Sequence, residues 1–336
     1  MSRAAVVAGL GAFVPPRVVT NHELAQRLDT SDEWIRSRTG IGERRVVDPG
    51  VATGDLAVEA AGRALKSAAA RGVAGADLVI LATTTPDRPC PATAPDVATR
   101  LGLDHVPAFD IAAVCSGFVY GLAMGAGAVA AGLAARVLVV GAETFTTILN
   151  PADRTTACVF GDGAGAVVLR AGEASEAGAL LEFDLGSDGS QAELLMIPAG
   201  GSRQRSSGIP AVPEDAYFAM QGRPVFQSAV LRMAASSRAA VRRTGWDLAS
   251  IDWLVGHQAN ARILHAVADQ LELPRERAVL NLDKVGNTSA ASIPLALAAG
   301  LAAGSFRVGD RMVLTAFGGG TTWGSATFTW PALDPV

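Results

Sequence analysis

The sequence has 336 residues, of which 49% are hydrophobic and 18% are charged, and its formal net charge is −4. A chain of this length can bury a large core, either in one large domain or in two fused ones. Its acidic balance gives no basic footprint for nucleic acid, and no apolar stretch has the length and character of a membrane span. Because the first residues lack a signal-peptide pattern, we expect a cytoplasmic protein.

The cysteines exclude two further classes of protein. Cys90, Cys115 and Cys158 are an odd number at wide spacing. Such a set makes neither a disulfide framework nor a metal site, so at least one thiol is free for chemistry.

Near the N-terminus, residues 30–33 (Thr-Ser-Asp-Glu) have the form of a capping box. In this motif Thr30 accepts a hydrogen bond from the backbone and Glu33 reaches back to it. We therefore expect a short helix that runs through Trp34 and Ile35.

Most of the remaining chain is an internal repeat with an offset of about 170 to 175 residues. Each copy contains a strand, a helix, a second strand, a turn, a small-residue helix and a closing strand. The first copy has its strands at 77–81, near 107–111 and at 136–140, and the second has strands at 252–256, after 273 and at 311–315. This alternation predicts an α/β fold with mostly parallel sheets, built from an N-terminal half (residues 1–175) and a C-terminal half (residues 176–336).

Between the copies, residues 200–210 form a polar, turn-rich loop, which is either a surface excursion or a lid. If the halves pack about a pseudo-twofold axis, the equivalent turns at Cys115 and Asn287 meet near that axis. His257 also ends a strand, at an edge of the sheet where ligand sites form in α/β proteins.

Cys115 lies between a strand and a small-residue helix. Unpaired N–H groups and the positive end of the helix dipole favour a thiolate there, and a thiolate is a nucleophile. The alternative is a buried structural cysteine. His257 is either a core histidine or an active-site imidazole. Asn287 is either a helix cap or a neutral donor to an oxyanion.

Residues 317–320 (Phe-Gly-Gly-Gly) are too flexible for a strand interior. They predict either a tight turn or a backbone that approaches a ligand and offers it N–H groups.

Six segments, taken in order, resemble the β-ketoacyl-acyl-carrier-protein synthase III family of the thiolase superfamily. They are residues 30–41, 109–115, 160–166, 257–260, 286–292 and 317–320. The resemblance implies a five-layered αβαβα fold and a homodimer. It also implies that no cofactor is needed, since acyl-coenzyme A and malonyl-acyl carrier protein are the substrates.

The resemblance further implies an acyltransferase that works in two stages. Cys115 would take an acyl group from acyl-coenzyme A. His257 and Asn287 would then assist decarboxylative condensation with the malonyl thioester, which primes fatty acid or polyketide synthesis. The N–H groups of Cys115 and Gly319 would hold the oxyanion.

Less specific positions would bind the substrates. In the family, Trp34 and Arg154 match residues that sandwich the coenzyme A adenine, and Arg38 matches one near its phosphates. Phe317 would shield the histidine, and Arg262 would contribute to carrier-protein docking.

At the position of Cys90, family members often have a bulky aromatic residue, which is contributed across the dimer to the acyl pocket. The smaller side chain predicts a longer or branched acyl primer.

Three other functions share some of these features. An acyltransferase that forms an ester or amide without condensation would keep Cys115, although both decarboxylation residues are present. A cysteine hydrolase uses Cys, His and Asn in the same order, but the repeat disfavours it. A binding-only relative would be expected to have lost one of the three.

Overall fold

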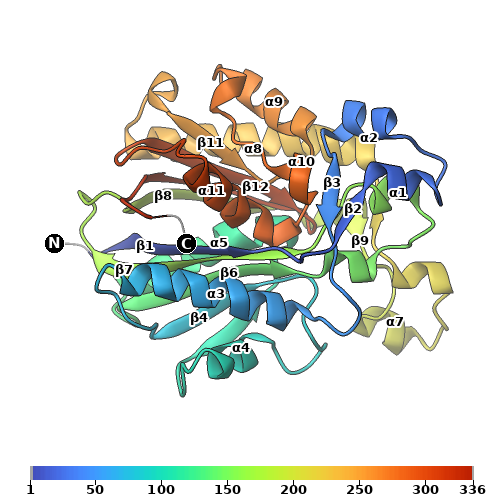
Figure 1. Cartoon of the computed structure of the whole chain (residues 1–336), viewed down its shortest axis with the longest axis horizontal. Helices are drawn as coiled ribbons and strands as arrows, with labels where there is room; N and C mark the ends of the chain where they lie inside the picture. The colour runs from blue at the N-terminus through green and yellow to red at the C-terminus, as the bar shows by residue number, and fades with distance from the viewer. Residues whose placement is uncertain (1–2, 335–336) are drawn as a thin grey trace.

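The computed structural model describes residues 3–334 and stacks helices and sheets in five layers (Figure 1). The first layer contains α3 (Thr53–Ala69) and α4 (Ala94–Arg100), which cover a five-stranded sheet. That sheet has the order β1 (Ala4–Phe13), β7 (Gly163–Gly172), β6 (Arg136–Glu143), β4 (Leu78–Ala82) and β5 (Ala108–Ile111).

Two small-residue helices form the central layer. They are α5 (Gly117–Ala130) and α11 (Ser292–Ala302), and they separate the first sheet from a four-stranded one. The second sheet has the order β11 (Trp253–Gly256), β12 (Arg311–Gly318), β13 (Thr322–Thr329) and β8 (Leu180–Ser187). On its outer face lie α8 (Gly222–Thr244) and α9 (Ala261–Gln270), at the top of Figure 1.

Shorter elements surround these layers. They are β2 (Val18–Thr20), α1 (Asn21–Ala25), α2 (Asp32–Thr39), β3 (Glu43–Arg45), α6 (Arg154–Ala157), β9 (Leu195–Met196), α7 (Ser202–Ser207), β10 (Ala219–Met220) and α10 (Leu282–Val285). The polar loop predicted at residues 200–210 contains the exposed helix α7, which projects at the edge of the molecule (Figure 1).

Helix α5 is rich in glycine because it packs directly on the first sheet. A Cβ atom at Gly121 would lie 2.8 Å from Val139 Cγ1, and one at Gly125 would lie 2.9 Å from Leu169 Cδ1. Any larger residue at either position would push α5 away from β6 and β7.

The sheets are mixed, so the prediction of mostly parallel sheets is wrong. Strand β4 runs parallel to β5 and β6, and β11 runs parallel to β12. The pairs β1–β7, β6–β7, β12–β13 and β13–β8 are antiparallel. For β12 and β13 the reason is local, because only residues 319–321 join them, which is too short for a parallel crossover.

The repeat and the first cap also differ in detail from the prediction. The strand expected after residue 273 is reduced to one bridge between Leu254 and Ala278. Pro274 has no N–H to donate, and a 3-10 turn at residues 275–277 follows it. The cap of α2 is Ser31, whose side chain accepts from the backbone N–H of Trp34 at 3.1 Å, so the assignment of this cap to Thr30 is wrong.

Candidate active site

Cys115 lies in η1 (Val114–Ser116), a single 3-10 turn directly before α5. Val114 adopts φ +46°, a left-handed conformation that is strained for a β-branched residue. Hydrogen bonds from Ser116 Oγ (2.8 Å) and Thr322 Oγ1 (3.1 Å) to the Ala113 carbonyl hold the turn. These contacts fix the direction of the Cys115 side chain.

Burial governs the protonation of this thiol. It raises the pKa of Cys115 from 9.0 to about 12, while a hydrogen bond with the Ser289 side chain acts in the opposite direction. Such a rise corresponds to about 4 kcal/mol, whereas a helix end contributes at most about 2 kcal/mol. The sequence-based expectation of a lowered pKa for Cys115 is therefore wrong, because desolvation outweighs the helix dipole.

Asn287 lies on the second turn, just before η7 (Ser289–Ala291). Its Oδ1 accepts the backbone N–H of Ser289 at 2.9 Å, which leaves the Nδ2 donors to point elsewhere. Its backbone is also tied to the loop before β7, since its N–H donates to the Val159 carbonyl and its carbonyl accepts from Gly161 N–H, both at 2.9 Å. The Asn287 side chain is thus held as an oriented amide donor.

His257 follows β11 and is 3% exposed. Burial lowers the pKa of His257 from 6.5 to about 3, so its imidazole is neutral at physiological pH. Its Nδ1 lies 2.7 Å from Ser292 Oγ at the start of α11. If the hydroxyl donates to Nδ1, the ring proton is on Nε2, which can then donate a hydrogen bond.

The structure brings the two turns together, as the repeat predicts. A Cβ atom at Gly117, next to the Cys115 turn, would lie 3.6 Å from Ala290 Cβ in the second turn. Ser289 joins them, since its N–H donates to Asn287 Oδ1 and its side chain lowers the pKa of Cys115. His257 joins the same cluster through Ser292, three residues after Ser289.

Sequence reasoning missed three residues of this cluster, namely Glu143, Ser289 and Ser292. The two serines lie in the segment 286–292, and their proximity to Asn287 was the available signal. Glu143 ends the apolar strand β6 and is completely buried. A charged residue at the end of such a strand was its only signal.

The glycine-rich segment lies directly beneath the nucleophile. A Cβ atom at Gly318 would lie 2.8 Å from Cys115 N, and one at Gly319 would lie 3.3 Å from Val114 Cγ2. In the described residues, neither Cys115 N–H nor Gly319 N–H donates a backbone hydrogen bond outside the helices and strands. Phe317 is buried, as a shielding residue would be.

A separate group of cationic side chains surrounds Trp34 on α2. The guanidinium groups of Arg38 and Arg154 lie 5.0 and 5.2 Å from the Trp34 ring centroid. Arg154 Nη1 donates to the Asp29 carbonyl at 2.6 Å and also contacts its carboxylate at 3.2 Å. A base stacked between Trp34 and Arg154 therefore requires the arginine to move outwards.

Arg262 lies exposed at the start of α9, with its guanidinium 5.8 Å from the Phe226 ring centroid. Asn260 caps this helix and donates from Nδ2 to the Arg38 carbonyl at 2.9 Å, so α9 is tied to the end of α2. This bond places Arg262 near the cationic group around Trp34.

Whereas Cys115 is buried, Cys90 is exposed in the loop between β4 and α4. Beside it, a pocket of about 400 Å³ is lined by Arg88, Pro89, Ile111 and Val114 among others. Val114 links this pocket to the nucleophile's own turn.

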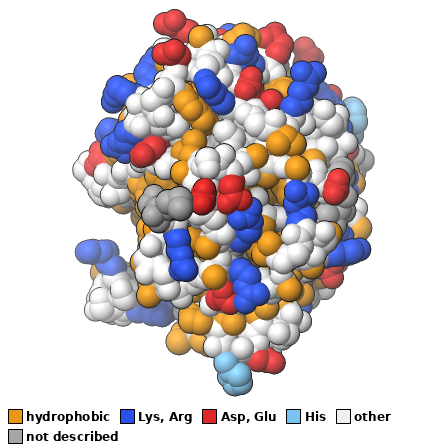
Figure 2. Space-filling model, turned by 90° about the vertical axis from the view of Figure 1, so that its left-hand side faces the viewer, with side chains coloured by type: hydrophobic (Ala, Val, Ile, Leu, Met, Phe, Trp, Pro, Cys, Tyr) orange, Lys and Arg blue, Asp and Glu red, His pale blue; other side chains and the backbone are white. Residues whose placement is uncertain are grey.

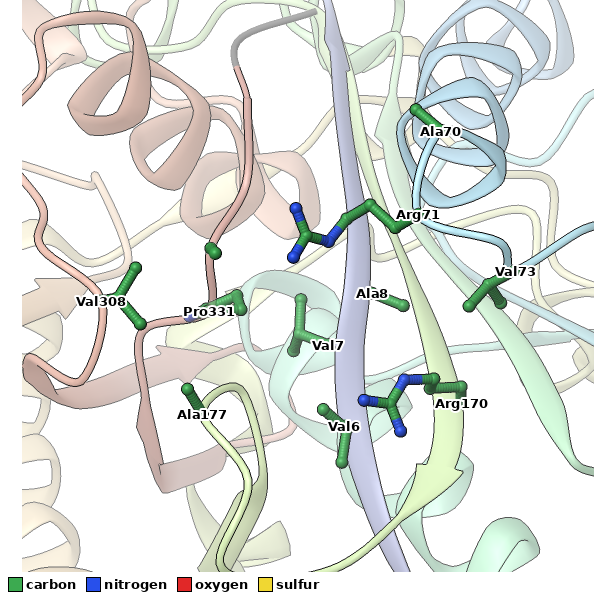
Figure 3. Close-up of a pocket in the computed structure, with 11 residues that line it drawn as sticks. Val6, Val7, Ala8, Ala70, Arg71, Val73, Arg170, Ala177, Val308 and Pro331 are labelled. Atoms are coloured by element: carbon green, nitrogen blue, oxygen red, sulfur yellow. The ribbon is translucent and has the colours of Figure 1, made fainter.

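Another pocket, of about 460 Å³, lies beside residues 6–8 of β1 (Figure 3). Arg71 and Arg170 border it together with Val7 and Pro331. Arg170 is already paired with Glu176. None of the candidate site residues lines this pocket, so it is separate from the cluster around Cys115.

The described residues give two general findings. Among residues 3–334, no helix is long and apolar enough to cross a membrane, and no three His, Cys, Asp or Glu side chains group as a metal site requires. On the face in Figure 2, acidic and basic side chains are interspersed instead of forming a continuous patch of one sign.

Comparisons with known proteins agree with this architecture. The model of the 3-oxoacyl-[acyl-carrier-protein] synthase III family matches residues 109–189, and the model of its C-terminal part matches residues 241–330. Beta-ketoacyl-[acyl-carrier-protein] synthase III 5 of Streptomyces coelicolor is 62% identical over 336 residues, covering 100% of both chains. The Pseudomonas aeruginosa PAO1 synthase III is 56% identical, covering 100% of this chain and 99% of the relative.

Solved structures show the same relationship. The crystal structure of 3-oxoacyl-(acyl carrier protein) synthase III from Pseudomonas aeruginosa PAO1 matches with a TM-score of 0.92 and 54% identity, covering 99% of this chain and 100% of that one. The priming β-ketosynthase from the R1128 polyketide pathway matches with a TM-score of 0.90 and 32% identity, covering 100% and 98%.

The layered fold and these relatives define an acyl-transferring condensing enzyme with the thiolase fold. At 62% identity over its full length to a named synthase III, the chain belongs to the 3-oxoacyl-[acyl-carrier-protein] synthase III family. The predicted fold class and the resemblance that implied it are therefore confirmed.

Proposed function

We propose that Cys115 carries the acyl chain between two half-reactions. In the first, its Sγ attacks the carbonyl of an acyl-coenzyme A, and coenzyme A leaves as the thiol. In the second, a malonyl thioester on the acyl carrier protein loses carbon dioxide, and the resulting carbanion attacks the acyl-cysteine. The new carbon–carbon bond forms as the Cys115–acyl bond breaks, which primes fatty acid or polyketide synthesis.

The burial of His257 and its Nδ1 contact with Ser292 Oγ best support this reaction over hydrolysis. An imidazole with a pKa of about 3 is a poor base for water, but its Nε2–H can donate to the thioester oxygen of the malonyl group. The Asn287 amide supplies a second neutral donor as the enolate forms. The N–H groups of Cys115 and Gly319 hold the tetrahedral oxyanion, and Phe317 shields the histidine.

Coenzyme A binds, in this proposal, at the cationic group around Trp34. The adenine stacks between Trp34 and Arg154 once Arg154 leaves Asp29, and Arg38 lies near the phosphates. Arg262, exposed on α9, contributes to docking of the acidic carrier protein.

The enzyme acts as a homodimer of two chains, each with an N-terminal half (residues 1–175) that carries Cys115 and a C-terminal half (residues 176–336) that carries His257 and Asn287. It needs no cofactor besides its substrates. A cytoplasmic location fits the three cysteines, all of which are unpaired.

The primer is the most specific part of the proposal. In a dimer, the partner's loop between β4 and α4 would close the acyl pocket, and a small residue at position 90 leaves its far end open. We therefore expect a longer or branched primer to be preferred over acetyl. The Cys90→Phe variant should then favour short primers, and an unchanged chain-length preference would contradict the idea.

Mass spectrometry of the intact protein after exposure to a panel of acyl-coenzyme A donors tests the loading step. The expected product is one acyl adduct on Cys115, whose mass identifies the primer. Release of carbon dioxide from malonyl-acyl carrier protein then distinguishes condensation from simple transfer to a hydroxyl or amine. Loading of Cys115 without carbon dioxide release would favour that alternative.

A further inference from the structure

Glu143 is a buried carboxyl group for which the condensation reaction provides no role. It is 0% exposed, and it forms no salt bridge in residues 3–334. Its oxygens accept the Thr84 N–H at 3.0 and 3.1 Å, Thr85 Oγ1 at 2.9 Å and Thr83 Oγ1 at 3.5 Å. Burial of a carboxyl group without a cationic partner is costly, which suggests that Glu143 has a functional role at this position.

Ser289 connects this carboxyl group to the nucleophile. Its Oγ donates to Glu143 Oε1 at 3.0 Å, and the same side chain acts on the Cys115 thiol, whose pKa it lowers. Its backbone N–H is already given to Asn287 Oδ1. Ser289 adopts φ +47° in the turn, a left-handed conformation that is uncommon for a residue other than glycine.

A serine hydroxyl has only one proton to donate. When Glu143 is ionised, the carboxylate competes for that proton, so the hydroxyl is less available to donate to a Cys115 thiolate. When Glu143 is neutral, the hydroxyl is free to donate to a Cys115 thiolate. The two acidic groups therefore compete for one donor.

We propose that Glu143 is a positioning residue that controls, through the Ser289 hydroxyl, how readily Cys115 gives up its proton. The inference rests on the proposed role of Cys115 as the acyl carrier. The buried pair holds one negative charge easily and two only at high cost, as in other coupled acid pairs. An ionised Glu143 thus opposes the thiolate, and a neutral Glu143 permits it.

The surroundings of Glu143 make this coupling specific. Ser289 on η7 and the three threonines of the loop after β4 bind it directly, and its charge acts on the Cys115 thiol of η1. Burial raises the pKa of Glu143 to about 7, and the negative charge of Glu143 raises the pKa of Cys115. The charge of Glu143 therefore changes near neutral pH, where the enzyme is expected to work.

Alkylation of Cys115 by iodoacetamide tests the inference without any acyl substrate. The rate is measured against pH in the full-length protein, and the adduct is assigned to Cys115 by peptide mass spectrometry. Glu143→Gln removes the negative charge, so its curve should move to lower pH, with roughly tenfold faster alkylation at neutral pH. Ser289→Ala removes the donor, so its curve should move to higher pH.

Asp162→Asn is the matched control. Asp162 is also a buried carboxyl group with a pKa raised by burial, but its partners are Thr146 and Val47. Its curve should coincide with that of the wild type. An unchanged curve in Glu143→Gln, or an equal shift in Asp162→Asn, would overturn the proposal.

Thermal unfolding and acyl loading of Cys115 distinguish a misfolded variant, a failed inference and a failed proposed function. Thermal unfolding of each variant identifies any that fails to fold, and if Glu143→Gln does so, an unshifted Ser289→Ala curve overturns the proposal by itself. Failure of the proposed function would look different. Acyl-coenzyme A would then leave Cys115 unmodified, while the alkylation curves still shift.

Discussion

The Cys115 turn and the Asn287 turn share one backbone design but carry opposite chemistry. Each begins with a left-handed residue, Val114 at φ +46° or Ser289 at φ +47°. Each continues as a three-residue 3-10 turn that leads into a central helix. The position that holds Cys115 in the first turn holds Ala290 in the second.

The difference lies in where the polar groups are placed. In the first turn the strained residue is apolar, and the reactive thiol follows it. In the second turn the strained residue is Ser289, and Asn287 precedes it. One turn therefore supplies a nucleophile, whereas the other supplies donors. The comparison predicts that loading and decarboxylation can be damaged separately.

Removal of the thiol should have the largest effect. Cys115→Ala removes the nucleophile and leaves alanine, the residue type that the second turn has at the equivalent position. Loading from acyl-coenzyme A should therefore fall by about a thousandfold or more. Decarboxylation of the malonyl thioester should continue, because His257 and Asn287 are untouched. Intact mass measures the first step, and carbon dioxide release measures the second.

Cys158→Ala is the control for that experiment, because Cys158 is also a buried thiol. It should load normally. Loss of both activities in Cys115→Ala, with the fold intact by circular dichroism, would contradict the separation of the two turns.

Ser292→Ala should have the converse and smaller effect. The Ser292 hydroxyl is the hydrogen-bond partner of His257 Nδ1 at 2.7 Å, and the loss of a buried partner costs about 1–3 kcal/mol. Decarboxylation should slow by about 10- to 100-fold, while the acyl adduct on Cys115 still forms at the normal rate.

Ser237→Ala provides the comparison, since Ser237 is equally buried but pairs with Ser325 at 3.3 Å. It should retain both half-reactions. A Ser292→Ala variant that loads slowly but decarboxylates normally would reverse the assignment of the second turn.

The sequence predicted which turns meet but not the contacts that adjust their chemistry. The repeat and the apolar strands predicted the layers, and the small-residue helices marked Cys115 and Asn287. Glu143 escaped notice because its partners lie 58 to 146 positions away, so no local spacing reveals it. The pKa of Cys115 was misjudged for a similar reason, since burial arises from the whole fold.

Local competition explains the other errors. Thr30 and Ser31 are adjacent and both can cap a helix, so the chain's path decides which of them does so. The missing second-half strand follows from Pro274 and a 3-10 turn at Arg275–Arg277, which leave little extended backbone to pair. In each case the residue types indicated the kind of local structure, but they did not determine which residue caps the helix or whether a strand forms.

Glycines packed against the two turns allow loading and decarboxylation to be disturbed separately, with the smallest expected effects. A Cβ atom at Gly318 would lie 2.8 Å from Cys115 N, and one at Gly141 would lie 2.3 Å from the Ala290 carbonyl oxygen. Each substitution by alanine forces one turn to move, at a cost of about 1–3 kcal/mol in the free energy of unfolding. Gly318→Ala should therefore reduce loading severalfold, and Gly141→Ala should reduce decarboxylation. Gly127→Ala on α5, where a Cβ atom meets nothing within 4 Å, should leave both rates unchanged.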